Sequence, residues 1–114
     1  MIFVTGPMYS GKGAFVKELL QLSEDEYATK VLCPLTHCVG KLTDLDHMME
    51  LCKDYEAIIL PEIGSGVIPT EAAQEEMREA CGALAQRLAA EADVVVRVMC
   101  GVPNVIKGNL DSWQ

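Results

Sequence analysis

A phosphate-loop pattern placed directly after a short apolar run is the strongest constraint on how this chain folds. The run covers residues 2–5, and the loop that follows has the form G-x-x-x-x-G-K and consists of Gly6, Pro7, Met8, Tyr9, Ser10, Gly11 and Lys12. In nucleotide-binding proteins such a loop joins a strand to a helix. Its backbone N–H groups and the helix N-terminus face phosphate, and its lysine reaches the outer phosphates. The pattern therefore predicts a strand, a phosphate cradle and a helix in succession.

Position 13 departs from the pattern at the residue that usually binds the metal. Ser or Thr normally follows the lysine, and its hydroxyl binds the Mg²⁺ that bridges the terminal phosphates. Gly13 has no side chain, so we expect GTP or ATP to bind with Mg²⁺ held only weakly or indirectly. The alternative is an ordinary glycine-rich turn that binds nothing. Gly13 favours it, because a glycine in the first helical turn costs about 1 kcal/mol relative to alanine.

Apolar runs alternate with helical patterns along the rest of the chain. We expect strands over 2–5, 31–33, 57–60 and 94–99, and helices over 12–22, 43–53 (with Thr43 as N-cap) and 70–92. This alternation is typical of right-handed βαβ units. It predicts a P-loop NTPase-like three-layer α/β/α fold with a mostly parallel sheet. Residues 1–108 are expected to form a single nucleotide-binding domain and residues 109–114 a C-terminal tail.

Helical spacing and short apolar runs also indicate which side chains fill the core. The expected buried positions are Phe15, Leu19 and Leu22 on the first helix, Met48 and Met49 on the second, and Met77, Cys81, Leu84 and Leu88 on the third. Methionine adapts its shape to irregular gaps, so Met48 and Met49 are interpreted as core residues.

Two further segments are expected to reach the carboxyl edge of the sheet, where open parallel sheets bind ligands. Glu62 directly follows the strand 57–60 and could hold Mg²⁺ through water or orient a nucleophile. A solvated loop carboxylate is the alternative. Gly64 and Gly66 follow it and would let the backbone approach the nucleotide closely. Arg97 lies inside the last strand, which indicates a subunit contact, an exposed strand edge or a buried carboxylate partner.

Composition restricts the partners and the compartment. A net charge of −8 opposes binding to nucleic acid or anionic membrane. No apolar run approaches the roughly 20 residues of a membrane span, which favours a cytoplasmic protein. The five cysteines are an odd number in a chain with no export signal and predict reduced thiols, with Cys52, Cys81 and Cys100 in the core. The segment 33–38 lacks the C-x₂-C spacing of structural zinc sites, so its thiols and His37 are interpreted as incidental.

Two blocks of the chain resemble a known enzyme family. The blocks are I-F-V-T-G-P-M-Y-S-G-K and P-E-I-G-S-G-V-I-P, followed by Arg78, Gly82, Gln86, Ala92-Asp93 and the segment 101–107. They are similar to the bifunctional adenosylcobinamide kinase/adenosylcobinamide-phosphate guanylyltransferase of cobalamin biosynthesis. The resemblance covers about residues 1–22 and 57–108. It implies a P-loop α/β fold and a trimeric assembly, with ATP or GTP held by residues 6–13, Lys12 on the transferred phosphate and Glu62 beside the nucleotide or its Mg²⁺.

The chain also departs from this family. Members of the family are longer and carry a helix whose histidine takes the guanylyl group, whereas neither His37 nor His47 stands in such a context. Ala85 replaces an asparagine of the late helix. The resemblance thus indicates a shortened, divergent member that binds nucleotide, with reduced or no transferase activity and with corrinoid as the implied substrate. If the protein is active, Lys12 and Glu62 would be its catalytic residues.

Two alternatives remain open at this point. One is a non-catalytic nucleotide-binding subunit that regulates or binds a partner, which the missing hydroxyl and missing histidine favour. The other is a small P-loop kinase for an unrelated metabolite, for which the middle region shows neither a lid segment nor an arginine cluster. In each case the protein is expected to be a homo-oligomer.

Overall fold

Five strands form one sheet in the computed structural model, which describes residues 1–7, 10–34, 44–61 and 72–111. The order across the sheet is β2-β3-β1-β4-β5. The strands are β1 (Ile2–Gly6), β2 (Val31–Leu32), β3 (Ala57–Pro61), β4 (Val94–Met99) and β5 (Val102–Lys107). The first four run parallel to their neighbours, and β5 pairs antiparallel with β4. The predicted mostly parallel sheet is confirmed.

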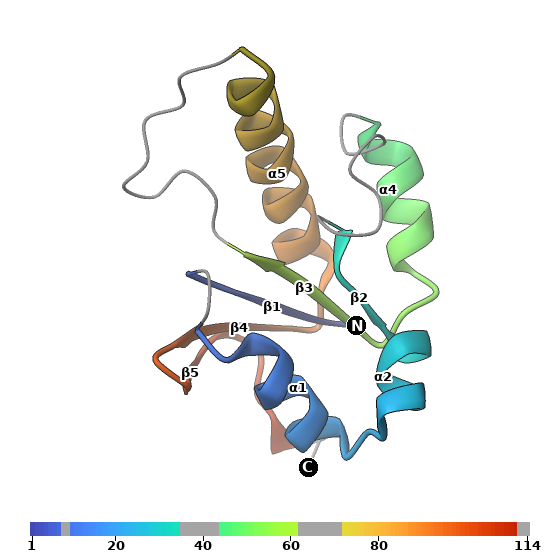
Figure 1. The fold of residues 1–114 in the computed structure, drawn as a ribbon, viewed down its shortest axis with the longest axis vertical. Helices are drawn as coiled ribbons and strands as arrows, with labels where there is room; N and C mark the ends of the chain where they lie inside the picture. The colour runs from blue at the N-terminus through green and yellow to red at the C-terminus, as the bar shows by residue number, and fades with distance from the viewer. Residues whose placement is uncertain (8–9, 35–43, 62–71, 112–114) are drawn as a thin grey trace.

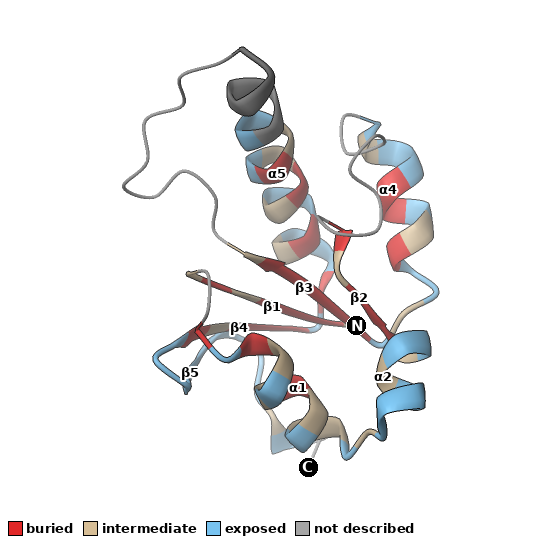
Figure 2. Cartoon of the chain, in the orientation of Figure 1, coloured by how far each residue is buried: buried red, intermediate tan, exposed pale blue. Residues whose placement is uncertain are grey.

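Helices cover both faces of this sheet (Figure 1). On one face lie α1 (Lys12–Leu20) and α2 (Glu24–Lys30), and on the other α4 (Leu45–Cys52) and α5 (Ala72–Glu91). Successive residues of β1 point to opposite faces, so Ile2 and Val4 belong to the core under α1 while Phe3 belongs to the core under α4 and α5. The red strands of Figure 2 show this two-sided burial. The predicted three-layer α/β/α fold is confirmed.

The face of the sheet that α4 and α5 cover is packed as the sequence pattern indicates. Met48 and Met49 are buried, and the predicted stripe on α5 is confirmed for Cys81, Leu84 and Leu88. The side chain of Met77 lies outside the described residues. The expectation that Thr43 caps the helix before Met48 is wrong. Asp44 is the N-cap, and its Oδ1 accepts a hydrogen bond from the His47 N–H at 3.2 Å. A carboxylate suits the positive end of the helix better than a hydroxyl does.

A second short helix, which the sequence analysis does not include, follows the first one. α1 ends at Leu20, and Gln21 follows with a left-handed φ of 54°. Ser23 Oγ then accepts from the Glu26 N–H at 3.2 Å, while Glu26 Oε1 accepts from the Ser23 N–H at 3.3 Å. This reciprocal capping box starts α2. The segment Ser23–Glu26 therefore begins a helix.

The connection between β4 and β5 corrects two further expectations. Cys100 and Gly101 have φ values of 52° and 76° and form a two-residue hairpin turn, so Cys100 is exposed and is not a core residue. The strand β4 lies between β1 and β5, so Arg97 is not at an exposed edge. It is half-buried and lies opposite Thr5 and Asn104 in the neighbouring strands.

The cysteines agree with a reduced protein within the described residues. Cys33, Cys52, Cys81 and Cys100 are free thiols, and Cys52 and Cys81 are buried as expected. Cys38 lies outside the described residues. None of the helices in the described part of the chain has the length and hydropathy that a membrane crossing needs.

Candidate functional site

The phosphate loop, residues 6–13, connects β1 to α1 as the sequence pattern predicts. Gly6 has a φ of 146°, and a Cβ at this position would collide with the carbonyl oxygen of Val98 in β4. Gly11 has a φ of 91° and caps the N-terminus of α1 in the left-handed conformation. Both glycines are therefore required by the backbone. Met8 and Tyr9 lie outside the described residues.

The β4–β5 hairpin turn holds this loop in position. The backbone N–H of Gly101 donates to the carbonyl oxygen of Ser10 at 2.8 Å. A Cβ on Gly11 would lie 3.4 Å from the Cα of Gly101, so the two backbones are in close contact. A segment near the end of the chain thus fixes the conformation of the loop near its beginning.

Lys12 lies over the loop with only 8% of its surface exposed. Its Nζ donates to the carbonyl oxygen of Pro7 and to Ser10 Oγ, the latter at 3.2 Å. A buried ammonium is stable only where polar groups replace its water, and these acceptors do so. The arrangement places a positive charge at the N-terminus of α1, whose dipole adds to it. The site is chemically suited to an anion.

On the α2 flank of α1, a tyrosine and a cysteine lie next to the loop. The Oη of Tyr27 is 3.0 Å from the place that a Cβ on Gly13 would take. The ammonium of Lys17 lies 4.8 Å from the centre of the Tyr27 ring. The Tyr27 hydroxyl also lies near the side chain of Cys33, just beyond β2.

The ionisation of these two groups reflects their burial. Burial is the main reason that the pKa of Tyr27 is raised to about 12, and the neighbouring Cys33 adds to the rise. Burial also raises the pKa of the Cys33 thiol, while the hydrogen bond from Tyr27 and the charge of Lys12 lower it. Both groups are therefore neutral near pH 7.

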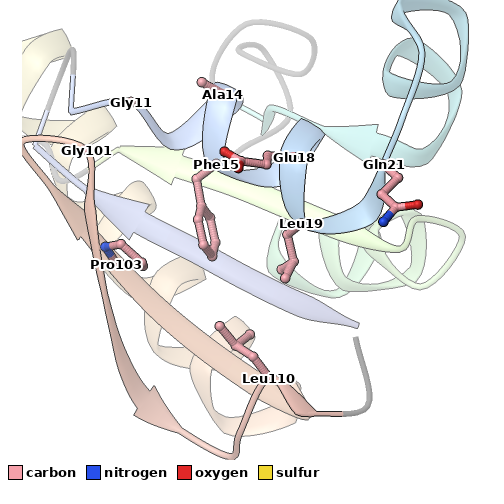
Figure 3. A pocket seen from close by; sticks show the side chains of 9 residues that line it. All are labelled: Gly11, Ala14, Phe15, Glu18, Leu19, Gln21, Gly101, Pro103 and Leu110. Carbon is pink, nitrogen blue, oxygen red and sulfur yellow. The ribbon is translucent and has the colours of Figure 1, made fainter. Parts of the chain in front are cut away.

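On the opposite flank of α1 lies a groove of about 520 Å³ (Figure 3). Its walls come from α1, from the hairpin and from the segment after β5: Gly11, Ala14, Phe15, Glu18, Leu19, Gln21, Gly101, Pro103 and Leu110. Phe15 and Leu19 extend from α1 toward the side that carries Pro103 and Leu110. Phe15, Leu19 and Leu22 pack at the margin of the core as half-buried side chains, and Val16 is the fully buried apolar residue of α1.

Three predicted site residues, Glu62, Gly64 and Gly66, lie outside the described residues, and so does His37, which the sequence analysis interprets as incidental. Pro61, the residue before Glu62, pairs with Gly6 at the start of the loop. His47 is exposed on α4, on the sheet face opposite α1 and Lys12. The described ranges contain no group of three or more side chains suited to hold a metal ion. A magnesium site at Glu62 therefore stays a prediction.

The residues of the C-terminal half that carry the family resemblance lie in two places, on α5 and in the segment 101–107, whose Gly101 contacts the phosphate loop. Arg78, Gly82 and Gln86 are exposed on α5. The Nζ of Lys107 donates to the carbonyl oxygens of Ala89 and Ala90 at 3.1 and 2.9 Å. These carbonyls belong to the last turn of α5, so Lys107 caps that helix.

Sequence reasoning missed Tyr27 and the groove. The groove forms only where α1, the hairpin and Leu110 meet, so no local pattern could have indicated it. Tyr27 had one sequence signal, the S-x-x-E capping box at Ser23 and Glu26, which places a helix immediately after α1.

Comparison with models of known protein families gives one family. The model of the family described as cobinamide kinase / cobinamide phosphate guanyltransferase matches residues 27–106, which is more than half of the chain. The match begins after the phosphate loop and includes Tyr27, Cys33 and the β4–β5 hairpin. Among curated proteins, none matches the chain significantly.

Proposed function

We propose, because this chain belongs to the cobinamide kinase / cobinamide phosphate guanyltransferase family, that it binds ATP or GTP through residues 6–13 in a role related to that family's reactions. The observation that carries this proposal is the buried Lys12 ammonium, held by Pro7 and Ser10 at the N-terminus of α1. A nucleotide phosphate offers this ammonium a charged acceptor in place of a carbonyl and a hydroxyl. Charge-assisted hydrogen bonds are about twice as strong as neutral ones.

Each predicted site residue has a defined part in this proposal. Backbone N–H groups of the loop and of the first turn of α1 would bind the phosphates, and Lys12 would neutralise the transferred one. Glu62 would bind Mg²⁺ through water, since it follows the strand residue that pairs with Gly6. Gly64 and Gly66 would allow the backbone after β3 to approach the ligand.

The groove beside α1 is proposed to take the nucleoside. Its volume of about 520 Å³ falls within the range of roughly 300–1,000 Å³ typical of small-molecule sites. The apolar walls would pack on the base, while Glu18 and Gln21 could hydrogen-bond to its polar edge. A corrinoid, the acceptor that the family's description implies, is larger and would need a surface beyond this groove.

Thermal denaturation with ATP and with GTP tests the proposed binding. Ligand at 100 times Kd adds about 2.7 kcal/mol to the free energy of unfolding, equivalent to a Tm rise of roughly 10 °C for a domain of this size. Lys12→Ala should abolish most of that rise. Lys53→Ala is the matched control, because Lys53 is exposed on the opposite face beside Glu50. Absence of any rise with millimolar nucleotide would contradict the proposal.

A non-catalytic nucleotide-binding subunit is the second candidate. Two observations favour it: position 13 offers no hydroxyl, and His47, the histidine among the described residues, lies on the sheet face opposite Lys12. We expect no covalent guanylyl adduct after incubation with labelled GTP and Mg²⁺, and a labelled peptide containing His37 or His47 would overturn that expectation. Mg²⁺-dependent turnover of cobinamide would separate a transferase from a binding subunit.

A homo-oligomer is proposed on the evidence of the sheet edge at β5. Val102, Val105 and Ile106 of β5 are exposed, as is Met99 at the end of β4, and Val102 and Ile106 are 65% and 59% exposed. Exposed edge strands pair readily with other chains unless something covers them. Light scattering should give a mass above the monomer's 12.4 kDa, and Ile106→Lys should lower it. A monomer at micromolar concentration would refute this proposal.

A further inference from the structure

We propose that the hydroxyl of Tyr27 supplies the oxygen ligand to the nucleotide's Mg²⁺ that Gly13 cannot supply. The inference rests on the proposed function, because the ion would arrive with the nucleotide in the phosphate loop. It adds a residue that comes from α2, outside the loop motif.

The position of the Tyr27 phenol oxygen is the observation that supports this proposal. A Cβ on Gly13 would lie 3.0 Å from Tyr27 Oη and 3.9 Å from Cζ, so the phenol points its hydroxyl at the site of the missing side chain. In a loop with serine, the hydroxyl stands one bond beyond that Cβ. The two hydroxyls, one from α1 and one from α2, would therefore compete for the same small region beside Lys12.

The surroundings hold this hydroxyl in place. Lys17 lies over the Tyr27 ring and pairs with Glu24 at 2.7 Å, which ties α1 to α2. The side chain of Cys33 lies beside this hydroxyl on the same flank of α1. A neutral phenol oxygen has lone pairs to offer a cation.

The chemistry of the group fits magnesium. Mg²⁺ prefers hard oxygen ligands and usually keeps several of its waters, so one protein hydroxyl together with phosphate oxygens completes a typical site. Tyr27 remains protonated near pH 7, like the serine hydroxyl that it would replace. Cys33 is a soft ligand and a poor partner for Mg²⁺. Its part is to orient Tyr27.

The test compares nucleotide affinity with excess Mg²⁺ and with excess EDTA by calorimetry, using ATP and GTP. In the unmodified protein Mg²⁺ should tighten binding. Tyr27→Phe should reduce this tightening about tenfold, the scale expected when a metal site loses a partner, and should leave the affinity in EDTA unchanged. Mn²⁺ bound with the nucleotide provides a second readout, since its electron paramagnetic resonance spectrum responds to a change of ligand.

A double variant shows whether Tyr27 binds the metal or only supports the structure. Gly13→Ser alone places its Cβ against Tyr27 Oη, so we expect crowding and a weakened Mg²⁺ effect. Tyr27→Phe with Gly13→Ser removes the clash and returns one hydroxyl, and should restore the Mg²⁺ effect. Tyr55→Phe is the matched control, because Tyr55 packs against the core on the other face of the sheet.

The outcomes distinguish this inference from the proposed nucleotide binding on which it rests. If Tyr27→Phe binds nucleotide in EDTA normally and keeps or increases the Mg²⁺ effect, the inference is wrong and the nucleotide site stands. An increased Mg²⁺ effect in Tyr27→Phe would mean that the phenol obstructs metal binding. A protein that binds neither nucleotide under either condition would refute the proposed function and this inference with it.

Discussion

The two flanks of α1 differ in a way that suggests different tasks. On the α2 flank, the Tyr27 hydroxyl lies beside Gly13, and Lys17 and Cys33 lie next to Tyr27. On the hairpin flank, apolar side chains such as Phe15 and Leu110 line an open groove. A polar, filled surface suits a metal and its phosphates, whereas an open apolar one suits a base. One helix can thus position two chemically distinct parts of a nucleotide.

The largest expected effect comes from the close contact between the phosphate loop and β4. Gly6→Ala introduces a Cβ that collides with the Val98 carbonyl, in a backbone conformation with φ of 146°. Strain and overpacking together should cost about 3 kcal/mol of unfolding free energy. Gly82→Ala is the control, since nothing lies within 4 Å of the added Cβ and Gly82 is inside a helix. It should stabilise by about 0.5–1 kcal/mol. If Gly6→Ala and Gly82→Ala changed the free energy of unfolding in urea equally, the phosphate loop would not contact β4 as described.

Phe15→Ala tests the assignment of the groove. Removing the ring takes away an apolar wall, and we expect nucleotide affinity to fall about tenfold, or about 1.4 kcal/mol. The loss should be the same in Mg²⁺ and in EDTA, in contrast to Tyr27→Phe. A loss that appears only with Mg²⁺ would contradict the division between the two flanks. Calorimetry on both variants makes the comparison.

The α2 flank can be loosened without touching the loop. Ser23→Ala removes the hydroxyl of the capping box and should cost about 1 kcal/mol. Because α2 carries Tyr27, the variant should also weaken the Mg²⁺ effect on nucleotide binding. Thr29→Ala, at an exposed position of the same helix, should change neither quantity appreciably. An unchanged Mg²⁺ effect in a measurably destabilised Ser23→Ala protein would separate α2 from the metal.

The last effect is confined to alkaline pH. The pKa of Tyr27 is about 12 in the folded protein and 10.0 ordinarily. The unfolded chain therefore loses this proton first, and the stability linked to it is full below pH 10 and is lost between about pH 10 and 12. Ultraviolet titration of the protein against Tyr27→Phe should show one phenolate appearing near pH 12. Its appearance near pH 10 would mean that the hydroxyl faces solvent.

Burial explains which elements could be predicted from the sequence. The strands β1, β3 and β4 are buried on both faces and appear as continuous apolar runs, and α5 shows its stripe at Cys81, Leu84 and Leu88. All six residues of β5 are exposed, so that strand has no alternating pattern to detect. The seven residues of α2 are too few to establish a helical period.

The candidate site also has one part that could be predicted from the sequence and one part that could not. The phosphate loop is a local motif in which Gly6 and Gly11 each adopt a positive φ, so its position between β1 and α1 could be predicted. The contact of Tyr27 with Gly13 depends on how α2 folds back beside α1, and no local sequence pattern specifies that contact. Cys100 failed as a core prediction because its apolar neighbours in the sequence belong to a strand, whereas the residue itself lies in the turn that follows.

The hydrogen bond from Gly101 to Ser10 also determines when the site can exist. A chain leaves the ribosome from its N-terminus, so the phosphate loop is synthesised well before the hairpin that holds it. Until the β4–β5 hairpin has emerged and paired with β1, the loop lacks the amide that fixes Ser10. Nucleotide binding by a nascent chain would therefore report that the whole sheet has assembled, although every residue of the binding motif had been made long before.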